Sequence, residues 1–148
     1  MNKQAAPTPE KPKAIVMGHA DFAVGMRSAV DKITGRGAAL IALSGQDLSL
    51  AQIEEKLRST LKETGVDVVF TDLQAGSATM AARKVLRDAP QVVLVVGANL
   101  PMLLDFVLST AATPREAVDH AVARGTSCIA VHGGTVIPSA AKDPGPKK

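Results

Sequence analysis

Two residues with side chains suited to nucleophilic chemistry stand at the ends of apolar runs. His19 follows the run 14–17 and Gly18, and Asp72 ends a second run that begins at Val66. A neutral imidazole has one nitrogen with a free lone pair, and a carboxylate bound to the other nitrogen fixes the tautomer and stabilises positive charge on the ring. The pair predicts a histidine nucleophile oriented by an aspartate. Two simpler interpretations stay open: His19 as a turn residue, and Asp72 as a cap of the following turn.

A second set of residues is suited to binding phosphate or a partner. Gly76 and Ser77 precede a predicted helix, with Ser77 as its candidate N-cap, and a helix N-terminus offers free N–H groups to phosphate oxygens. Asn99 is expected to be a helix cap or a hydrogen-bonding residue at the same rim. Arg27 is a candidate for partner docking or charge stabilisation, unless it is simply solvated. His120 is expected to be solvated on a predicted amphipathic helix, and His132 is expected to be structural.

The pattern of apolar runs predicts the scaffold that positions these residues. Short runs, several of them apolar throughout, indicate strands buried on both faces, and amphipathic helical patterns fill the gaps. We expect a single α/β domain with a doubly wound, mainly parallel sheet and helices on both faces. If the first and third strands are neighbours, His19 and Asp72 emerge at the carboxyl edge, where ligand sites lie. The predicted strands are 14–17, 38–43, 66–71, 92–96 and 128–131; the predicted helices are 22–34, 50–64, 78–89, 100–111 and 114–125.

The composition excludes several classes of function. The chain of 148 residues has no Trp, no Tyr and three Phe, which weighs against base stacking in a nucleic-acid binder. Residues 1–13 and 138–148 are Pro- and Lys-rich, and we expect both tails to be disordered. Each carries a charge of +2, which leaves −1 of the total of +3 for the domain 14–137, so a polyanion partner is not expected.

Other sequence signals point to a cytoplasmic protein without a metal or cofactor. A single cysteine, Cys128, excludes an internal disulfide, and we expect it to be buried in the last strand. No run approaches a membrane span, and no signal sequence is evident. Metal-ligand spacing and nucleotide-binding glycine motifs are both missing from the sequence. If phosphate is handled here, we expect another protein to deliver it.

Three motifs give the chain a family resemblance. They are Gly-His-Ala-Asp-Phe-Ala-Val-Gly-Met at 18–26, Thr-Asp-Leu-Gln-Ala-Gly-Ser at 71–77 and Gly-Ala-Asn-Leu-Pro-Met-Leu at 97–103. In this order they resemble mannose-type enzyme IIA components of the phosphoenolpyruvate:sugar phosphotransferase system (PTS), over about residues 14–110.

The resemblance implies a phosphohistidine carrier that forms a homodimer. His19 would accept a phosphoryl group from the phosphocarrier protein HPr and pass it to a IIB component, which serves a membrane sugar permease. Asp72 would orient the imidazole, and Ser77 with the Gly76 turn would contact the phosphoryl oxygens. The last strand, 128–131, would pair with the sheet of the partner subunit.

The chain departs from the family pattern in its second motif. Ala75 stands where the family has the first glycine of a pair, Ala78 replaces a proline, and Met80 replaces an asparagine. These changes bear on the phosphate loop and the IIB contact, but not on His19 or Asp72. Three alternatives remain: a regulatory protein controlled by phosphorylation of His19, the phosphoryl-donor subunit of dihydroxyacetone kinase, and a receiver-like domain phosphorylated on Asp72.

Overall fold

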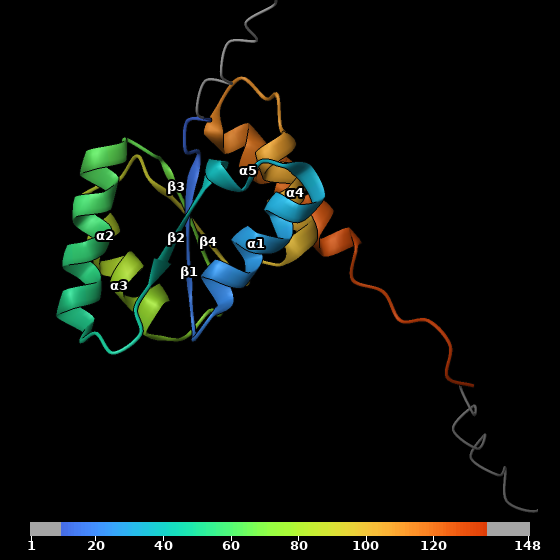
Figure 1. Ribbon diagram of the computed structural model, residues 1–148, viewed down its shortest axis with the longest axis horizontal. Coiled ribbons are helices and arrows are strands. Elements are labelled where there is room, and N and C mark those ends of the chain that lie inside the picture. Colours follow the sequence, from blue (N-terminus) through green and yellow to red (C-terminus); the bar gives the residue numbers. More distant parts are fainter. Residues whose placement is uncertain (1–9, 136–148) are drawn as a thin grey trace, which may run out of the picture.

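Four parallel strands and five α-helices alternate along residues 10–135, the part of the chain that the computed structural model describes (Figure 1). The elements follow the predicted βα order, with one short 3-10 helix, η1, before the second strand. Their bounds are β1 Ala14–Gly18, α1 Phe22–Thr34, η1 Gly37–Ala39, β2 Leu40–Ser44, α2 Leu50–Thr64, β3 Val68–Thr71, α3 Ser77–Leu86, β4 Val93–Val96, α4 Leu100–Leu108 and α5 Pro114–Ser127.

The sheet has the strand order β2-β1-β3-β4, which confirms the doubly wound topology. The first connection places β2 on one side of β1, and the next two place β3 and β4 on the other. Met17 therefore pairs with Leu43 of β2 and with Thr71 of β3. The direction of winding changes at β1, so the switch point lies between the carboxyl ends of β1 and β3, where His19 and Asp72 follow.

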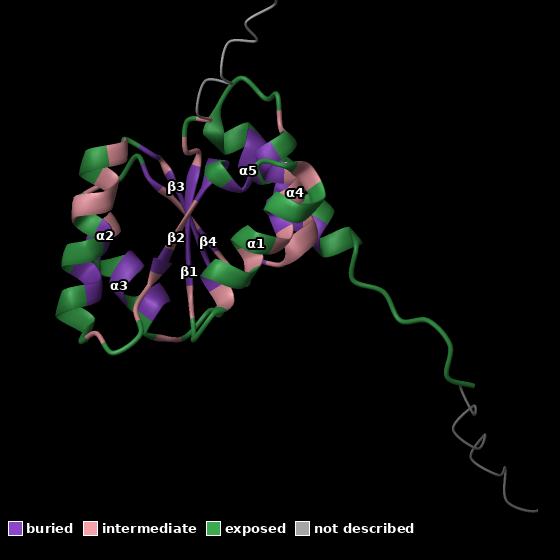
Figure 2. Ribbon diagram, in the orientation of Figure 1, coloured by how far each residue is buried: buried purple, intermediate pink, exposed green. Residues whose placement is uncertain are grey.

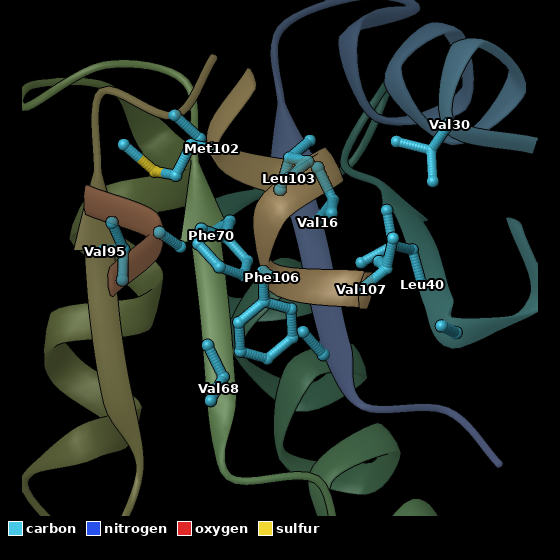
Figure 3. Close-up of a cluster of buried hydrophobic side chains, with 14 of the residues drawn as sticks. Val16, Val30, Leu40, Val68, Phe70, Val95, Met102, Leu103, Phe106 and Val107 are labelled. Carbon is cyan, nitrogen blue, oxygen red and sulfur yellow. The ribbon is translucent and has the colours of Figure 1, made fainter. Parts of the chain in front are cut away.

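The sheet is covered by helices on both faces, and successive residues of a strand point into two separate cores. Ala14 and Val16 pack with α1, α4 and α5, whereas Ile15 and Met17 pack with α2 and α3. Figure 1 shows these two helical layers, and Figure 2 shows the buried strands between them. The first core holds the ring of Phe70 edge-on to that of Phe106, with centroids 5.0 Å apart (Figure 3).

Side-chain caps define several helix boundaries as expected from the sequence. Ser49 and Gln52 form the predicted capping box of α2, and Gly65 ends that helix in the left-handed conformation with φ 67°. Thr113 caps α5 by accepting a hydrogen bond from the Glu116 N–H. The expected Ser77 cap is wrong: Gly76 is the N-cap of α3, and Ser77 is its first helical residue.

The predicted fifth strand, 128–131, is not formed, and Cys128 is exposed rather than buried. The helix α5 continues past Gly125, the expected end, to Ser127. Gly125 packs closely against the start of α4, since a Cβ there would lie 2.8 Å from Asn99 Oδ1 and from Met102 Cβ. The chain then runs away from the sheet (Figure 1), so the backbone of residues 128–131 has no neighbouring strand in this chain to pair with. Ile129 is 74% exposed and Val131 is 95% exposed.

The two predicted tails fall mostly on residues 1–9 and 136–148, which lie outside the described residues. Lys13, at the end of the predicted N-terminal tail, is tied to the fold: its N–H donates to the Ala39 carbonyl at 2.7 Å and its Nζ to the Val107 carbonyl at 3.2 Å. Among residues 10–135, none of the helices is both long enough and apolar enough to cross a membrane.

Candidate functional site

His19 stands on a tight turn between β1 and α1. The turn is closed by a hydrogen bond of 2.9 Å from the Phe22 N–H to the His19 carbonyl, and Ala20 adopts a φ of 44°. A non-glycine residue with positive φ is uncommon and indicates a turn held by its surroundings. The His19 side chain is 57% exposed, so the ring projects from the carboxyl edge of the sheet.

Asp72 binds both the backbone and the ring of His19. Its Oδ2 accepts from the His19 N–H at 2.8 Å and lies 2.7 Å from His19 Nδ1, while its Oδ1 accepts from the Leu73 N–H at 2.9 Å. With an ionised carboxylate beside it, Nδ1 is the protonated nitrogen of the neutral ring, and Nε2 keeps its lone pair. The structure therefore brings together the two residues that the sequence analysis paired.

The electrostatics of Asp72 favour its ionised form. Burial raises the pKa of the carboxyl group, but the hydrogen bonds from the backbone and ring of His19, the charge of that ring and the Leu73 N–H outweigh burial and hold the pKa below its ordinary value. A carboxylate is consequently present to accept the Nδ1 proton and to stabilise positive charge on the imidazole.

Two glycines allow the His19–Asp72 pair to sit this close to the backbone. A Cβ on Gly18 would lie 2.8 Å from Asp72 Cγ and 2.5 Å from Phe22 Cδ1. A Cβ on Gly76 would lie 2.8 Å from His19 Cε1 and 3.5 Å from Nε2. Gly76 also has a φ of 149°, which side chains rarely adopt. The imidazole is therefore packed directly against the backbone at the start of α3.

The first turn of α3 presents backbone donors beside this ring. The first hydrogen bond of the helix runs from the Met80 N–H to the Gly76 carbonyl, so the N–H groups of residues 77–79 have no partner within the helix. Ser77 is exposed at this end. Ala75, one of the departures from the family motif, avoids positive φ, so its methyl group does not strain the loop.

A cavity of about 180 Å³ lies on the β2 side of His19. Its polar rim includes His19, Ser77 and Gln46, and its floor is apolar, with Leu43 and Ile53. Neither lysine nor arginine is among the described residues that line it. A larger cavity of about 400 Å³ lies at the amino edge of the sheet, next to Lys13 and Phe106, and is remote from the histidine.

Sequence reasoning missed the loop between β2 and α2, which supplies Gln46 to this cavity. The signal was available in the predicted strand order: β2 is the other neighbour of β1, so its carboxyl end must also flank His19. It also missed Thr79, a buried threonine of α3 below the Asp72 loop. A single threonine in a helical pattern does not indicate that its side chain is buried beneath a neighbouring loop.

Two other candidate residues have structural contacts away from the imidazole. Asn99 caps α4 by accepting from the Met102 N–H at 3.1 Å, and its Nδ2 donates to the Gly125 carbonyl at 2.9 Å. The oxygen of its amide thus caps α4, and the nitrogen joins this end of α4 to α5. The Arg27 Nε donates to the Gly37 carbonyl at 3.2 Å, at the amino edge of the sheet.

The remaining histidines stand apart from the site. His120 is exposed on α5, and His132 is exposed in the segment that follows this helix. Within residues 10–135, no three His, Cys, Asp or Glu side chains gather as metal ligands. The site can supply one exposed nucleophilic nitrogen, His19 Nε2. The Asp72 carboxylate binds the other ring nitrogen, Nδ1, and the backbone N–H groups at the start of α3 lie beside the ring.

Comparison with known proteins places this geometry among phosphotransferase components. The family model described as "PTS system fructose IIA component" matches residues 13–123. The mannose/sorbose-specific IIA subunit of the phosphotransferase system from Enterococcus faecalis is 28% identical, with a TM-score of 0.73, over 84% of this chain and 97% of that one.

Two further solved structures share the fold at lower identity. The phosphotransferase system component EIIA from Streptococcus agalactiae is 22% identical (TM-score 0.72, 80% of this chain and 95% of that one). A sigma-54 interaction domain protein from Enterococcus faecalis is 12% identical (TM-score 0.64, 81% and 94%). A comparison with curated protein sequences gave no match.

Proposed function

The chain belongs to the family of PTS system fructose IIA components, and from this premise we propose that it is a phosphoryl carrier whose His19 accepts a phosphoryl group from HPr and passes it to a IIB component. Membership of the family supports a role in phosphotransfer. The observation that carries the finer proposal is the contact of 2.7 Å between His19 Nδ1 and Asp72 Oδ2, which leaves Nε2 free and exposed.

In the proposed reaction, the Nε2 lone pair attacks the phosphorus atom of phosphorylated HPr. A P–N bond to His19 forms while the bond between phosphorus and the donor group breaks, and the donor keeps the bonding electron pair. The imidazole ring gains positive charge, and the Asp72 carboxylate at Nδ1 stabilises it. Transfer to IIB reverses these steps: the acceptor attacks phosphorus and His19 recovers its lone pair.

The start of α3 is suited to holding the phosphoryl oxygens between the two transfers. Backbone N–H groups and the positive end of the helix dipole attract a dianion, and the exposed Ser77 can add a hydroxyl donor. Because neither Lys nor Arg is among the described residues lining the adjoining cavity, the phosphoryl group is held by neutral donors. Such a cradle positions the group for in-line transfer without the strong ion pairs that would oppose its departure.

We further propose a homodimer in which the segment after α5 packs against the partner subunit. Ile129 and Val131 are exposed to an extent that is unfavourable for apolar side chains in an isolated chain. The strand β4 is the edge of the sheet on the side of β3, and it offers free backbone groups to a further strand. Pairing of this segment with β4 of the partner subunit would bury the two apolar side chains and provide hydrogen-bond partners for the edge of the sheet.

The alternative function is regulatory: phosphorylation of His19 would control a partner protein rather than a transporter. The likeness to the sigma-54 interaction domain protein shows a shared fold and does not favour this alternative. The two functions differ in the second transfer, since only the transport function requires discharge onto a IIB component.

Phosphoryl uptake tests the proposed function directly. The full-length protein is incubated with phosphoenolpyruvate, enzyme I and HPr, and its intact mass is measured. We expect a gain of one phosphoryl group, which is lost in His19→Ala and retained in the matched variant His120→Ala, because His120 lies on the exposed face of α5. Adding a IIB component from the same organism should then discharge the protein.

The outcomes separate the hypotheses. No gain in mass with active enzyme I and HPr would refute the carrier function. Gain of a phosphoryl group without discharge onto any cognate IIB component would favour the regulatory alternative. A phosphate that survives in His19→Ala, or that is labile in alkali rather than in acid, would point to an acyl phosphate on an aspartate.

A further inference from the structure

Two hydroxyl groups are buried beneath the loop that carries Asp72. Thr71, the last residue of β3, is inaccessible to solvent, and Thr79, in the first turn of α3, is 1% exposed. Their Oγ1 atoms lie 2.7 Å apart, and the Thr79 hydroxyl donates to the Leu73 carbonyl. A buried hydroxyl is stabilised only when it is hydrogen-bonded, so these contacts fix how the first turn of α3 meets the end of β3.

These contacts hold both neighbours of Asp72. Thr71 precedes Asp72 and Leu73 follows it, and the single hydroxyl of Thr79 contacts both residues. The Leu73 N–H is also engaged, since it donates to Asp72 Oδ1 at 2.9 Å. Both backbone polar groups of Leu73 are therefore fixed although its side chain is exposed. One threonine closes the base of the loop 72–76.

A continuous chain of hydrogen bonds consequently links α3 to the imidazole. The Thr79 hydroxyl donates to the Leu73 carbonyl, the Leu73 N–H donates to Asp72 Oδ1, and His19 Nδ1 donates to Asp72 Oδ2. We propose that Thr79 is a positioning residue for phosphoryl transfer: its hydroxyl orients Asp72, and through Asp72 it selects the tautomer of His19 that leaves Nε2 free. The transfer part of this proposal rests on the proposed function; the tautomer part does not.

The chemistry at position 79 separates positioning from packing. Valine has the shape of threonine without the hydroxyl, so Thr79→Val keeps the volume and leaves the Leu73 carbonyl and the Thr71 hydroxyl without their partner. Serine keeps the hydroxyl and loses only a methyl group. Val85→Ala, on the same helix and equally buried, destabilises the packing of α3 while leaving the hydroxyl contacts intact.

The test uses the full-length protein and its Thr79→Val, Thr79→Ser and Val85→Ala variants. The tautomer of His19 is read from its ring ¹⁵N shifts at a pH where the ring is neutral, and the pKa of Asp72 from a ¹³C carboxyl titration. Initial rates of phosphoryl uptake from phosphorylated HPr and thermal unfolding midpoints are measured on the same samples.

We expect Thr79→Val to raise the fraction of the tautomer protonated at Nε2, to bring the pKa of Asp72 up towards its ordinary value, and to slow uptake about tenfold. Thr79→Ser should restore all three readouts towards wild type. Val85→Ala should lower the unfolding midpoint with the tautomer unchanged. A wild-type tautomer ratio in folded Thr79→Val, or the same tautomer change in Val85→Ala, would overturn the proposal. If neither the wild type nor any variant takes up phosphate, but the tautomer of His19 shifts as expected in Thr79→Val, the carrier function is refuted and the positioning role of Thr79 is supported.

Discussion

The most direct test of the contact between His19 and the start of α3 is the replacement of Gly76 by alanine. Gly76 lies against the imidazole of His19, and an added Cβ would be 2.8 Å from Cε1. Carbon atoms pack at about 3.5–4.0 Å, so the ring or the loop must move by at least about 0.7 Å. The φ of 149° adds backbone strain, which costs on the order of 1–3 kcal/mol for a residue with a side chain.

The expected result is a large loss of transfer rate with a smaller loss of stability. A displacement of about 1 Å in a reacting group costs roughly 100-fold in rate, so the uptake rate of Gly76→Ala should fall by about that factor. The ring is exposed and can turn aside, so the fold should persist with a lowered unfolding midpoint. Rapid-quench measurement of uptake from phosphorylated HPr, with thermal unfolding in parallel, gives both quantities.

Gly25→Ala is the matched control. Gly25 lies in α1 near the same edge, and a Cβ there would meet nothing within 4 Å. Alanine in a helix is favoured over glycine by about 1 kcal/mol, so this variant should be slightly more stable and transfer at the wild-type rate. If Gly76→Ala folds and takes up phosphate as fast as wild type, the argument that this glycine sets the position of the imidazole is refuted.

Three further predictions concern Asp72 and the segment after α5. Asp72→Asn should slow uptake by about 10–100-fold, since a hydrogen bond to a charged group contributes roughly 1.5–3 kcal/mol; an unchanged rate would remove Asp72 from the mechanism. Because the folded-state pKa of Asp72 is lowered, its stabilising contribution is present above the ordinary pKa and is lost as the pH falls through the lowered value. The difference in unfolding midpoint between wild type and Asp72→Asn should therefore shrink as the pH falls below the ordinary aspartate pKa of about 3.9, and a constant difference would contradict this linkage. Paired Ile129→Asp and Val131→Asp substitutions should shift the protein towards monomer in sedimentation velocity, whereas an unchanged oligomeric state would exclude this segment from the interface.

The scaffold was largely predictable because its signals are local or follow from topology. Continuous apolar runs gave the four strands, and the capping box at Ser49 marked the start of α2. The neighbouring position of β1 and β3 required one further step, the assumption that the direction of winding reverses after the first connection. With that step, the meeting of His19 and Asp72 at one edge follows without knowledge of any side-chain contact.

The failures concern interactions that a local pattern does not encode. The run 128–131 has the composition of a strand, but a strand needs a neighbour, and α5 carries this segment away from the sheet. The expectation that Asn99 is a helix cap is confirmed, but its second contact, with the Gly125 carbonyl of α5, depends on how α4 packs against α5. The role of Thr79 depends on where α3 meets the β3 loop, a contact that only the assembled structure defines.

The long separation along the chain between His19 and Asp72 makes formation of the site depend on complete folding. The two residues are 53 positions apart, and their contact exists only when β1 and β3 are in register. A nascent or partly unfolded chain still carries the imidazole but lacks the carboxylate that sets its proton. Under the proposed carrier function, competence to accept a phosphoryl group therefore requires the native topology, and molecules in which β1 and β3 are not paired are expected to stay unphosphorylated.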